Sequence, residues 1–211
     1  KDQALTAKTL RLANSSFYGL QCKVRTIDQA VAVLGFDSVR ALVTAAGIIG
    51  NAGTVGDAAH FDFPSFWRHA IGTALCAKSL ARLAKCNQEF AFVSGLLHDI
   101  GRLVLVTRFP QQYDAVVAWR NANDCDMLQA ERSVLGIDHA QVGRALAQHW
   151  KFPELIQRAI ANHHAPMGAD MGDIPSVVHA ANVIVHALDL AGAPDELVPA
   201  MSQAAWDSLK I

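Results

Sequence analysis

The stretch Ala91–Val106, AFVSGLLHDIGRLVLV, constrains the fold more than any other part of the chain. Apolar residues fall on every face of a helix drawn through it, which is typical of a helix surrounded by protein on all sides. Two ionisable residues, His98 and Asp99, interrupt this apolar stretch. A buried carboxylate is costly unless it pairs with a cation or binds a metal. The stretch therefore predicts a buried helix that carries a polar centre.

The composition is that of a folded chain. Its 211 residues are 52% hydrophobic and 18% charged, which is too apolar for disorder. A chain of this length buries a core without disulfide or metal support. The cysteines show no C-x-x-C spacing, so we expect them to be reduced thiols. They are Cys22, Cys76, Cys86 and Cys125.

Charge and hydropathy argue against two classes of partner. The formal net charge of −1 removes the usual electrostatic case for a nucleic-acid-binding patch. The longest strongly apolar runs, such as Ala41–Ile49, are far shorter than the ~20 residues that cross a bilayer. No basic-then-apolar leader opens the chain. We therefore expect a cytoplasmic protein that binds neither nucleic acid nor membrane.

The hydrophobic pattern predicts an all-α fold. Apolar residues recur at spacings of three and four along most of the chain, and the alternation typical of strands is scarce. The glycine-rich polar segment Asn51–His60 is the best candidate for a boundary between two parts. We therefore expect a smaller N-terminal helical lobe over residues 1–52 and a multi-helical bundle over residues 53–211.

Capping residues and prolines predict where several helices begin. Thr26 with Gln29 fits a capping box, and Gly35 is expected to end that helix. Two long helices are predicted over Glu89–Arg108 and Asp195–Ile211. Other helices are expected to start at or near Asp37, Pro64, Pro110, Asp126, Asp138, Pro153 and Pro175.

Histidines from distant parts of the chain can complete the polar centre at His98 and Asp99. The candidates are His69, His139, His163 and His164. Imidazoles and a carboxylate suit Zn, Fe, Mn or Ni. The alternative is that Asp99 pairs with a buried imidazole and no metal binds. Gly95 and Gly101 flank the pair and would let neighbouring backbones approach closely, where such ligands are presented.

Two further histidines are interpreted differently. His179 and His186 are seven residues apart and would share one helix face. A histidine on a helix face is more often a core or interface residue than a ligand. We therefore expect a structural role for both.

The run Gly95–Arg102, GLLHDIGR, resembles the HD superfamily of metal-dependent phosphohydrolases. Three further segments are similar to its HDOD branch, the HD-related output domain, and lie at Leu5–Gly19, Thr26–Val43 and Phe66–His69. The similarity covers most of the chain, and the catalytic HD hydrolases lack the N-terminal motifs. In the family a segment before Lys1 would complete the lobe, so we expect the lobe to lack its start.

The resemblance implies a metal site, and this sequence departs from the family's ligand pattern at one position. The HD pattern, transferred to this sequence, places ligands at His69, His98 and Asp99. The histidines of the related cyclic-dinucleotide phosphodiesterase branch fall at His139, His163 and His164. The aspartate that closes the pattern falls at Asn182, where an amide replaces a carboxylate. With Asp99 as the single carboxylate ligand, two divalent cations would be poorly neutralised.

Other departures concern the substrate. The phosphodiesterase branch has a glutamate after its paired histidines and a G-Y-P loop beyond. Ala165 and Pro166 follow the histidines in this chain, and no G-Y-P occurs in it. The lysine that usually follows the glycine of the motif is replaced by Arg102.

The leading hypothesis is a bacterial signal-transduction output or interaction module of HDOD type without catalytic activity. The resemblance implies that its partners are other signalling proteins or fused receiver and regulatory domains. The alternative is a metal-dependent phosphohydrolase acting on a nucleotide or a cyclic dinucleotide. A divalent metal (Fe, Mn, Zn or Ni) is the cofactor that the candidate ligands imply.

Overall fold

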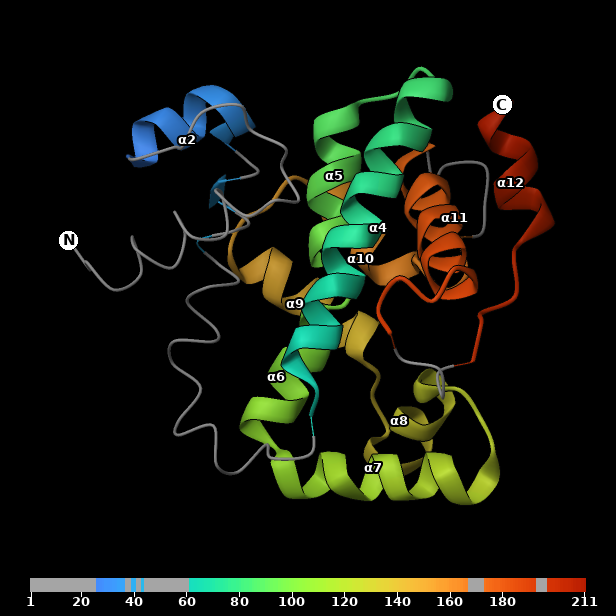
Figure 1. Ribbon diagram of the computed structural model, residues 1–211. Helices are drawn as coiled ribbons and strands as arrows, with labels where there is room; N and C mark the ends of the chain where they lie inside the picture. The colour runs from blue at the N-terminus through green and yellow to red at the C-terminus, as the bar shows by residue number, and fades with distance from the viewer. Residues whose placement is uncertain (1–25, 37–38, 41–42, 44–60, 167–172, 193–196) are drawn as a thin grey trace. The chain divides into compact units, whose positions relative to one another are not determined.

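The computed structural model of the protein describes residues 26–36, 39–40, 43, 61–166, 173–192 and 197–211. All regular secondary structure in these residues is helical, so the all-α prediction is confirmed (Figure 1). The chain divides into two compact units, Lys1–Gly53 and Thr54–Ile211. We describe each unit by itself.

In the first unit, one helix is described over its whole length. Helix α2 (Ile27–Leu34) begins after Thr26, whose hydroxyl accepts a hydrogen bond from the backbone N–H of Gln29 at 3.1 Å. It ends at Gly35, whose φ of 83° lies in the left-handed region that favours glycine. The predicted boundaries of this helix are thus confirmed. The helix expected after Asp37 lies largely outside the described residues.

The second unit is a bundle of helices. Its helices are α4 (Phe63–Leu83), α5 (Gln88–Leu97), α6 (Ile100–Arg108), α7 (Pro110–Asn123), α8 (Met127–Leu135), α9 (His139–His149), α10 (Glu154–Asn162), α11 (Asp173–Ala187) and α12 (Gln203–Leu209). Asp126 caps α8, and Asp138 forms a full capping box with Gln141 at the start of α9. These caps confirm the predicted starts of both helices.

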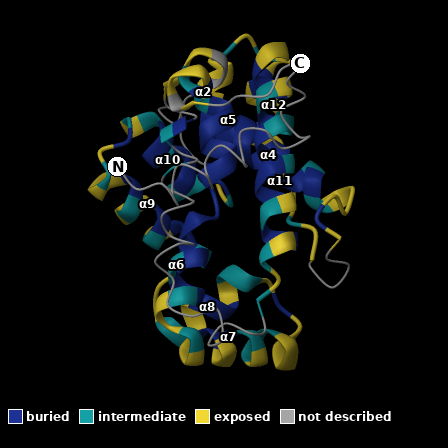
Figure 2. Ribbon diagram, turned by 60° about the vertical axis from the view of Figure 1, so that its left-hand side comes forward, coloured by how far each residue is buried: buried dark blue, intermediate teal, exposed yellow. Residues whose placement is uncertain are grey.

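The bundle is built around α5. This helix packs against α4, α10 and α11, and its residues from Ala91 onward are buried (Figure 2). Gly95 makes the contact with α4 possible, because a Cβ atom there would lie 2.9 Å from the Cα of Ala74. Gly101 plays the same part between α6 and α9, where a Cβ atom would overlap the carbonyl oxygen of His139. The close approach predicted at both glycines is confirmed.

The prediction of a single helix over Glu89–Arg108 is wrong. The structure ends α5 at Leu97 and starts α6 at Ile100, and Asp99 has φ −99° and ψ 12°. The carboxylate of Asp99 lies within 3.6 Å of ring nitrogens of His98, His139 and His163, and it makes an ion pair with Arg102. We attribute the break to these contacts, which favour a turn over a continued helix.

The helix predicted over Asp195–Ile211 is also too long. Helix α12 covers Gln203–Leu209, and its N-cap Ser202 accepts a hydrogen bond from the N–H of Ala205. Residues 197–202 are not helical. Pro199 lies in this segment and cannot donate the N–H that a helix interior requires.

One described segment is long and apolar enough to cross a membrane, judged by length and composition alone. It spans Gln88–Arg108, the region of α5 and α6, and is longer than the apolar runs considered above. However, 78% of its apolar window is buried inside the protein. A core helix passes the same test, so this segment is weak evidence for a membrane span.

Candidate metal centre

The structure brings together all six residues that the resemblance nominated as ligands. They come from four places: α4, the break between α5 and α6, the start of α9, and the C-terminal end of α10 with the residue after it. They form two groups, and within each group one ligand atom per residue lies within 4.8 Å of the others. One group is Asp99, His139, His163 and His164, and the other is His69, His98 and Asp99. Their assignment as ligands remains a prediction.

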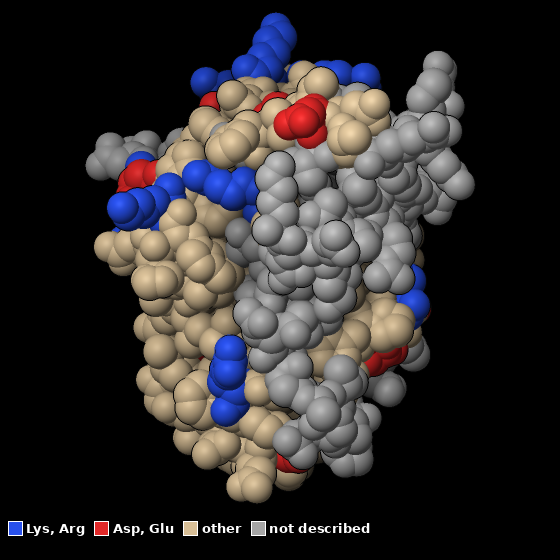
Figure 3. Space-filling view, turned by 90° about the vertical axis from the view of Figure 1, so that its left-hand side faces the viewer, with Lys and Arg blue, Asp and Glu red and all other residues tan. Residues whose placement is uncertain are grey.

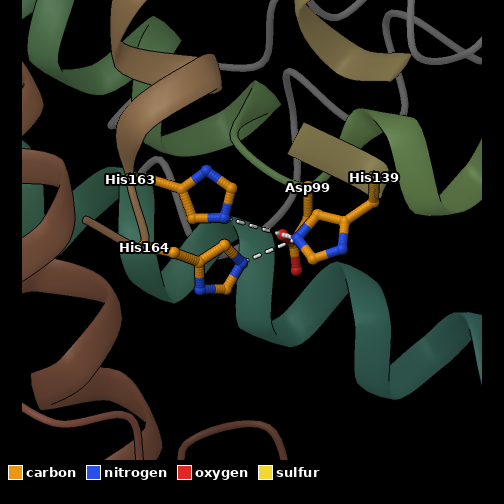
Figure 4. Close-up of side chains that lie close together, drawn as sticks. All are labelled: Asp99, His139, His163 and His164. Carbon is orange, nitrogen blue, oxygen red and sulfur yellow. Dashed lines mark hydrogen bonds and ion pairs between the residues drawn. The ribbon is translucent and has the colours of Figure 1, made fainter. Parts of the chain in front are cut away.

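In the first group, one carboxylate oxygen faces two imidazoles. Asp99 Oδ1 lies 3.3 Å from Nε2 of His139 and 3.3 Å from Nε2 of His163 (Figure 4). His164 completes the group, with its Nε2 2.8 Å from Nε2 of His139. The four side chains point toward one another from the turn before α6, the start of α9 and the end of α10, so they enclose a position where a cation can contact all of them.

In the second group, the other carboxylate oxygen has different neighbours. Asp99 Oδ2 lies 3.6 Å from Nε2 of His98 and 3.3 Å from Nη1 of Arg102. His69 Nε2 lies 3.2 Å from His98 Nε2. The carboxylate of Asp99 therefore connects the two groups, and a guanidinium is present only beside Oδ2 among the contacts described.

Backbone carbonyls orient two of the imidazoles. His98 Nδ1 lies 2.7 Å from the carbonyl oxygen of Gly95, and His163 Nδ1 lies 2.8 Å from that of Ile160. Each Nδ1 must carry the proton in order to donate to a carbonyl. A ring whose single proton is on Nδ1 presents an unprotonated Nε2 to the centre, which is the arrangement usual for metal-binding histidines.

Glu131 is a functional candidate that the sequence analysis missed. Its side chain is fully buried, and Oε2 accepts hydrogen bonds from the backbone N–H of His139 at 2.7 Å and from Nδ1 of the same residue at 2.6 Å. A carboxylate behind a histidine fixes the orientation of the ring and raises its basicity. A second buried acidic residue therefore belongs to the centre. It contacts His139, a candidate metal ligand, and would not itself contact the metal ion.

The protonation of the centre follows from these contacts. Burial lowers the pKa of His139, but Glu131 and Asp99 outweigh that effect and raise it to about 10. Burial lowers the pKa of His98 well below its usual value, and burial with the nearby His163 does the same at His164. Burial alone would raise the pKa of Asp99. The histidines around it have the larger effect and hold the pKa well below its usual value, so this carboxyl is ionised.

These donors fit a divalent transition metal. Neutral imidazole nitrogens and an ionised carboxylate are the ligands such ions prefer. Without a metal, the proton on His139 provides the positive charge between Glu131 and Asp99. A metal ion that binds here would take over that position and release the proton.

A pocket of about 620 Å³ adjoins the centre. Asp99, His139 and His164 reach its wall, and so do Asn182 and His186 of α11. Asn182 is buried, and its Oδ1 accepts no hydrogen bond from any described residue. An oxygen in this state can accept from a ligand or contact a cation, which a carboxylate at this position would do more strongly.

The two histidines expected to be structural have different surroundings. The ring of His186 lies 4.4 Å from that of His69, and it lines the pocket, so it belongs near the centre. His179 lies behind the centre: its Nδ1 donates to the carbonyl oxygen of His163 at 2.8 Å, and its Nε2 accepts from the N–H of Ser202 at 2.9 Å. His179 thus links α11 to α10 and to the start of α12.

We predict that His179→Ala destabilises the bundle by about 2 kcal/mol, because it removes the partners of the buried carbonyl of His163 and of the partly buried N–H of Ser202. The expected readout is a lower midpoint in urea unfolding. His149→Ala, at an exposed position, is the control and should leave the midpoint unchanged. An unchanged midpoint in His179→Ala would show that water replaces both hydrogen bonds at no cost.

The described surface in one view shows no continuous basic patch. Lys and Arg side chains of the described residues form a few small groups there, on a surface that is otherwise mostly uncharged (Figure 3). Among the described cysteines, Cys76, Cys86 and Cys125 are free thiols.

A helical bundle with a buried histidine–aspartate centre is the mark of an HD-type domain. The family model of the HDOD domain matches residues 1–166, and the chain belongs to that family. This agrees with the resemblance seen in the sequence.

Solved structures share the fold. A candidate phosphohydrolase from Shewanella amazonensis SB2B is 30% identical, with a TM-score of 0.70 and coverage of 99% of this chain and 79% of that one. A candidate signal transduction protein from Marinobacter aquaeolei VT8 is 25% identical, with a TM-score of 0.72 and coverage of 100% and 47%. The MmoQ response regulator from Methylococcus capsulatus str. Bath is 25% identical, with a TM-score of 0.56 and coverage of 98% and 79%.

A curated relative is longer than this chain. An uncharacterized protein of Treponema pallidum (strain Nichols) is 27% identical over 203 residues, which are 94% of this chain and 39% of the relative. The chain therefore spans about two fifths of the length of that relative.

Proposed function

We propose that the chain is a signal-transduction module of HDOD type in which the histidine–aspartate centre binds a divalent metal without hydrolysing a phosphodiester. The observation that carries this proposal is the small number of negatively charged oxygen donors, which is seen at Asp99 and Asn182. Asp99 is the one carboxylate within the two candidate ligand groups of the described residues, and the second oxygen donor of the pattern is a neutral amide. Phosphoryl transfer needs cations that neutralise the phosphate and activate water.

The partners we propose are other signalling proteins or fused receiver and regulatory domains. The similarity to a response regulator supports this proposal, and so does the greater length of the curated relative. We propose residues 1–52 and 53–211 as the domains of the module. Bacterial relatives and free thiols support a bacterial, cytoplasmic location.

The second candidate function is a metal-dependent phosphohydrolase. Two observations favour it: the buried carboxylate of Glu131 adds negative charge behind His139, and a pocket of about 620 Å³ reaches the candidate ligands. The likeness to a candidate phosphohydrolase points the same way. The missing carboxylate at Asn182 and the absent G-Y-P loop weigh against it.

A metal analysis combined with a hydrolysis assay tests the proposal. The chain is purified without chelator, its metal content is measured, and it is incubated with Mn²⁺ or Fe²⁺ and a cyclic dinucleotide or a chromogenic phosphodiester. We expect bound metal and no turnover above buffer. Asn182→Asp is the companion variant, and it should bind metal about tenfold more tightly, since it adds a charged oxygen donor.

Two outcomes would contradict the proposal in different ways. Turnover by the wild-type chain that disappears in Asp99→Asn would establish the phosphohydrolase instead. No metal bound at any concentration up to millimolar would leave an ordinary buried ion-pair cluster as the account of the centre.

A further inference from the structure

We propose that the centre holds one divalent cation, on the Oδ1 side of Asp99 among His139, His163 and His164, and that Glu131 is the positioning residue for this ion. This inference rests on the proposed metal-binding function and makes it specific. It assigns no ion to the side of the centre formed by His69 and His98.

The two oxygens of Asp99 differ in their electrostatic surroundings. Oδ1 faces two imidazole nitrogens at 3.3 Å, and no guanidinium contact is described at this oxygen. Oδ2 faces the guanidinium of Arg102 at 3.3 Å, and arginine remains charged at any relevant pH. A cation placed beside Oδ2 would be repelled by that group at close range. The first side is therefore the favourable one for a metal ion.

The imidazoles on the Oδ2 side are already paired with each other. His98 carries its proton on Nδ1, so its Nε2 is an acceptor, and the 3.2 Å contact makes His69 Nε2 the donor. In this arrangement the lone pair of His98 is used by His69, and His69 offers an N–H to the centre. A metal ion on this side would have to break that hydrogen bond, and one on the Oδ1 side would have to break the 2.8 Å contact between His139 and His164. The pairing of imidazoles therefore leaves the choice of side to the charges of Arg102 and Glu131.

Glu131 corrects the charge balance on the Oδ1 side. The candidate ligands there include one carboxylate, and Glu131 adds a second negative charge through its 2.6 Å contact with His139 Nδ1. Two carboxylates therefore act on the Oδ1 side, while the guanidinium of Arg102 offsets part of the charge of Asp99 from the other side. This charge can match one divalent cation but not two, because Asn182 contributes none. The same hydrogen bond turns the Nε2 atom of His139 toward Asp99.

Access to the centre agrees with this assignment. The wall of the pocket includes His139 and His164 together with Asp99 and Arg102, whereas His69 and His98 are not among its lining residues. Two of the three imidazoles on the Oδ1 side are therefore reached from the pocket, and neither imidazole on the Oδ2 side is.

Cobalt(II) titration of the full 211-residue chain tests the inference, because Co²⁺ bound by nitrogen and oxygen ligands absorbs visible light in a way that reports its coordination. We expect one Co²⁺ per chain. His164→Ala should weaken binding at least about tenfold and alter the spectrum, since it removes a ligand. Glu131→Gln keeps an oxygen that accepts both hydrogen bonds but lacks the charge, and it should also weaken binding about 10- to 100-fold. His69→Gln should leave affinity and spectrum close to those of the wild type.

Controls separate a positioning role from a structural one. Glu154→Gln removes an exposed carboxylate and should change nothing. Urea unfolding of the metal-free variants shows whether each is folded before titration. If Glu131→Gln does not fold, His164→Ala and His69→Gln still decide the location of the ion, because His164 is only partly buried.

The outcomes distinguish this inference from the function on which it rests. A wild-type chain that binds no Co²⁺ would overturn both. Two ions per chain, or equal losses in His69→Gln and His164→Ala, would overturn the single-ion assignment and leave metal binding intact. Unchanged affinity and spectrum in a folded Glu131→Gln would overturn the positioning role of Glu131.

Discussion

Asp99→Asn should reduce metal affinity about 100-fold or more, the largest effect expected from any single substitution at the centre. Asp99 is the one residue common to both candidate ligand groups, and its two oxygens face imidazoles on either side. Asparagine keeps the shape of the side chain but removes the charge that attracts the cation. A 100-fold loss corresponds to about 2.7 kcal/mol of binding free energy.

The measurement is a metal titration combined with thermal unfolding. A metal that binds the folded chain raises its stability by about 2.7 kcal/mol at a free concentration of 100 times Kd, so Mn²⁺ or Zn²⁺ should raise the unfolding temperature of the wild type and not that of Asp99→Asn. Asp126→Asn is the matched control, because it removes an exposed carboxylate from the same pocket and asparagine caps a helix equally well. Full metal-dependent stabilisation of Asp99→Asn would exclude Asp99 as a ligand.

Much of the fold was predictable because its signals are local. The hydroxyl of Thr26 and the carboxylates of Asp126 and Asp138 each accept a hydrogen bond from a backbone N–H three residues on, so sequence spacing alone identifies them. The positions of Gly95 and Gly101 also predicted the close approach of neighbouring helices. A glycine inside a buried helix usually marks a place where a Cβ atom would not fit.

The break at Asp99 was not predictable from local signals. Neither proline nor glycine stands at residues 98 and 99, and the flanking apolar residues favour a continuous helix. The turn depends on contacts of Asp99 with residues far away in the chain, such as His139 and His163. Tertiary contacts of this kind override helix propensity, and a single sequence does not display them.

The candidate site was predictable in its ligands but not in its charge. His69 and His98 stand in motifs that resemble a known family, whereas Glu131 stands in an amphipathic helix where a glutamate is normally exposed. A loop separates it from His139, eight residues later, and no local pattern shows that its side chain turns inward. The sequence therefore indicated one carboxylate, Asp99, whereas the centre as a whole has two, Asp99 and Glu131.

Gly101→Ala should destabilise the bundle by about 3 kcal/mol or more and weaken metal binding at the same time. A Cβ atom on residue 101 would overlap the carbonyl oxygen of His139 and lie 2.8 Å from the backbone nitrogen of Gly143. Backbone atoms cannot rotate away as a side chain can, so α6 and α9 must separate. His139 is the first residue of α9, and its Nε2 would move away from Asp99.

Gly72→Ala is the control for this prediction. Gly72 also lies inside a helix of the bundle, but a Cβ atom there would meet the side chain of Val185 at 3.4 Å, an ordinary contact. Alanine favours a helix over glycine by up to about 1 kcal/mol, so this variant should be neutral or more stable in urea unfolding. Gly101→Ala gains the same propensity, which means that any loss of stability measures the clash with α9. Equal stability of the two variants would show that α9 shifts without cost, and metal affinity would then report whether His139 moved with it.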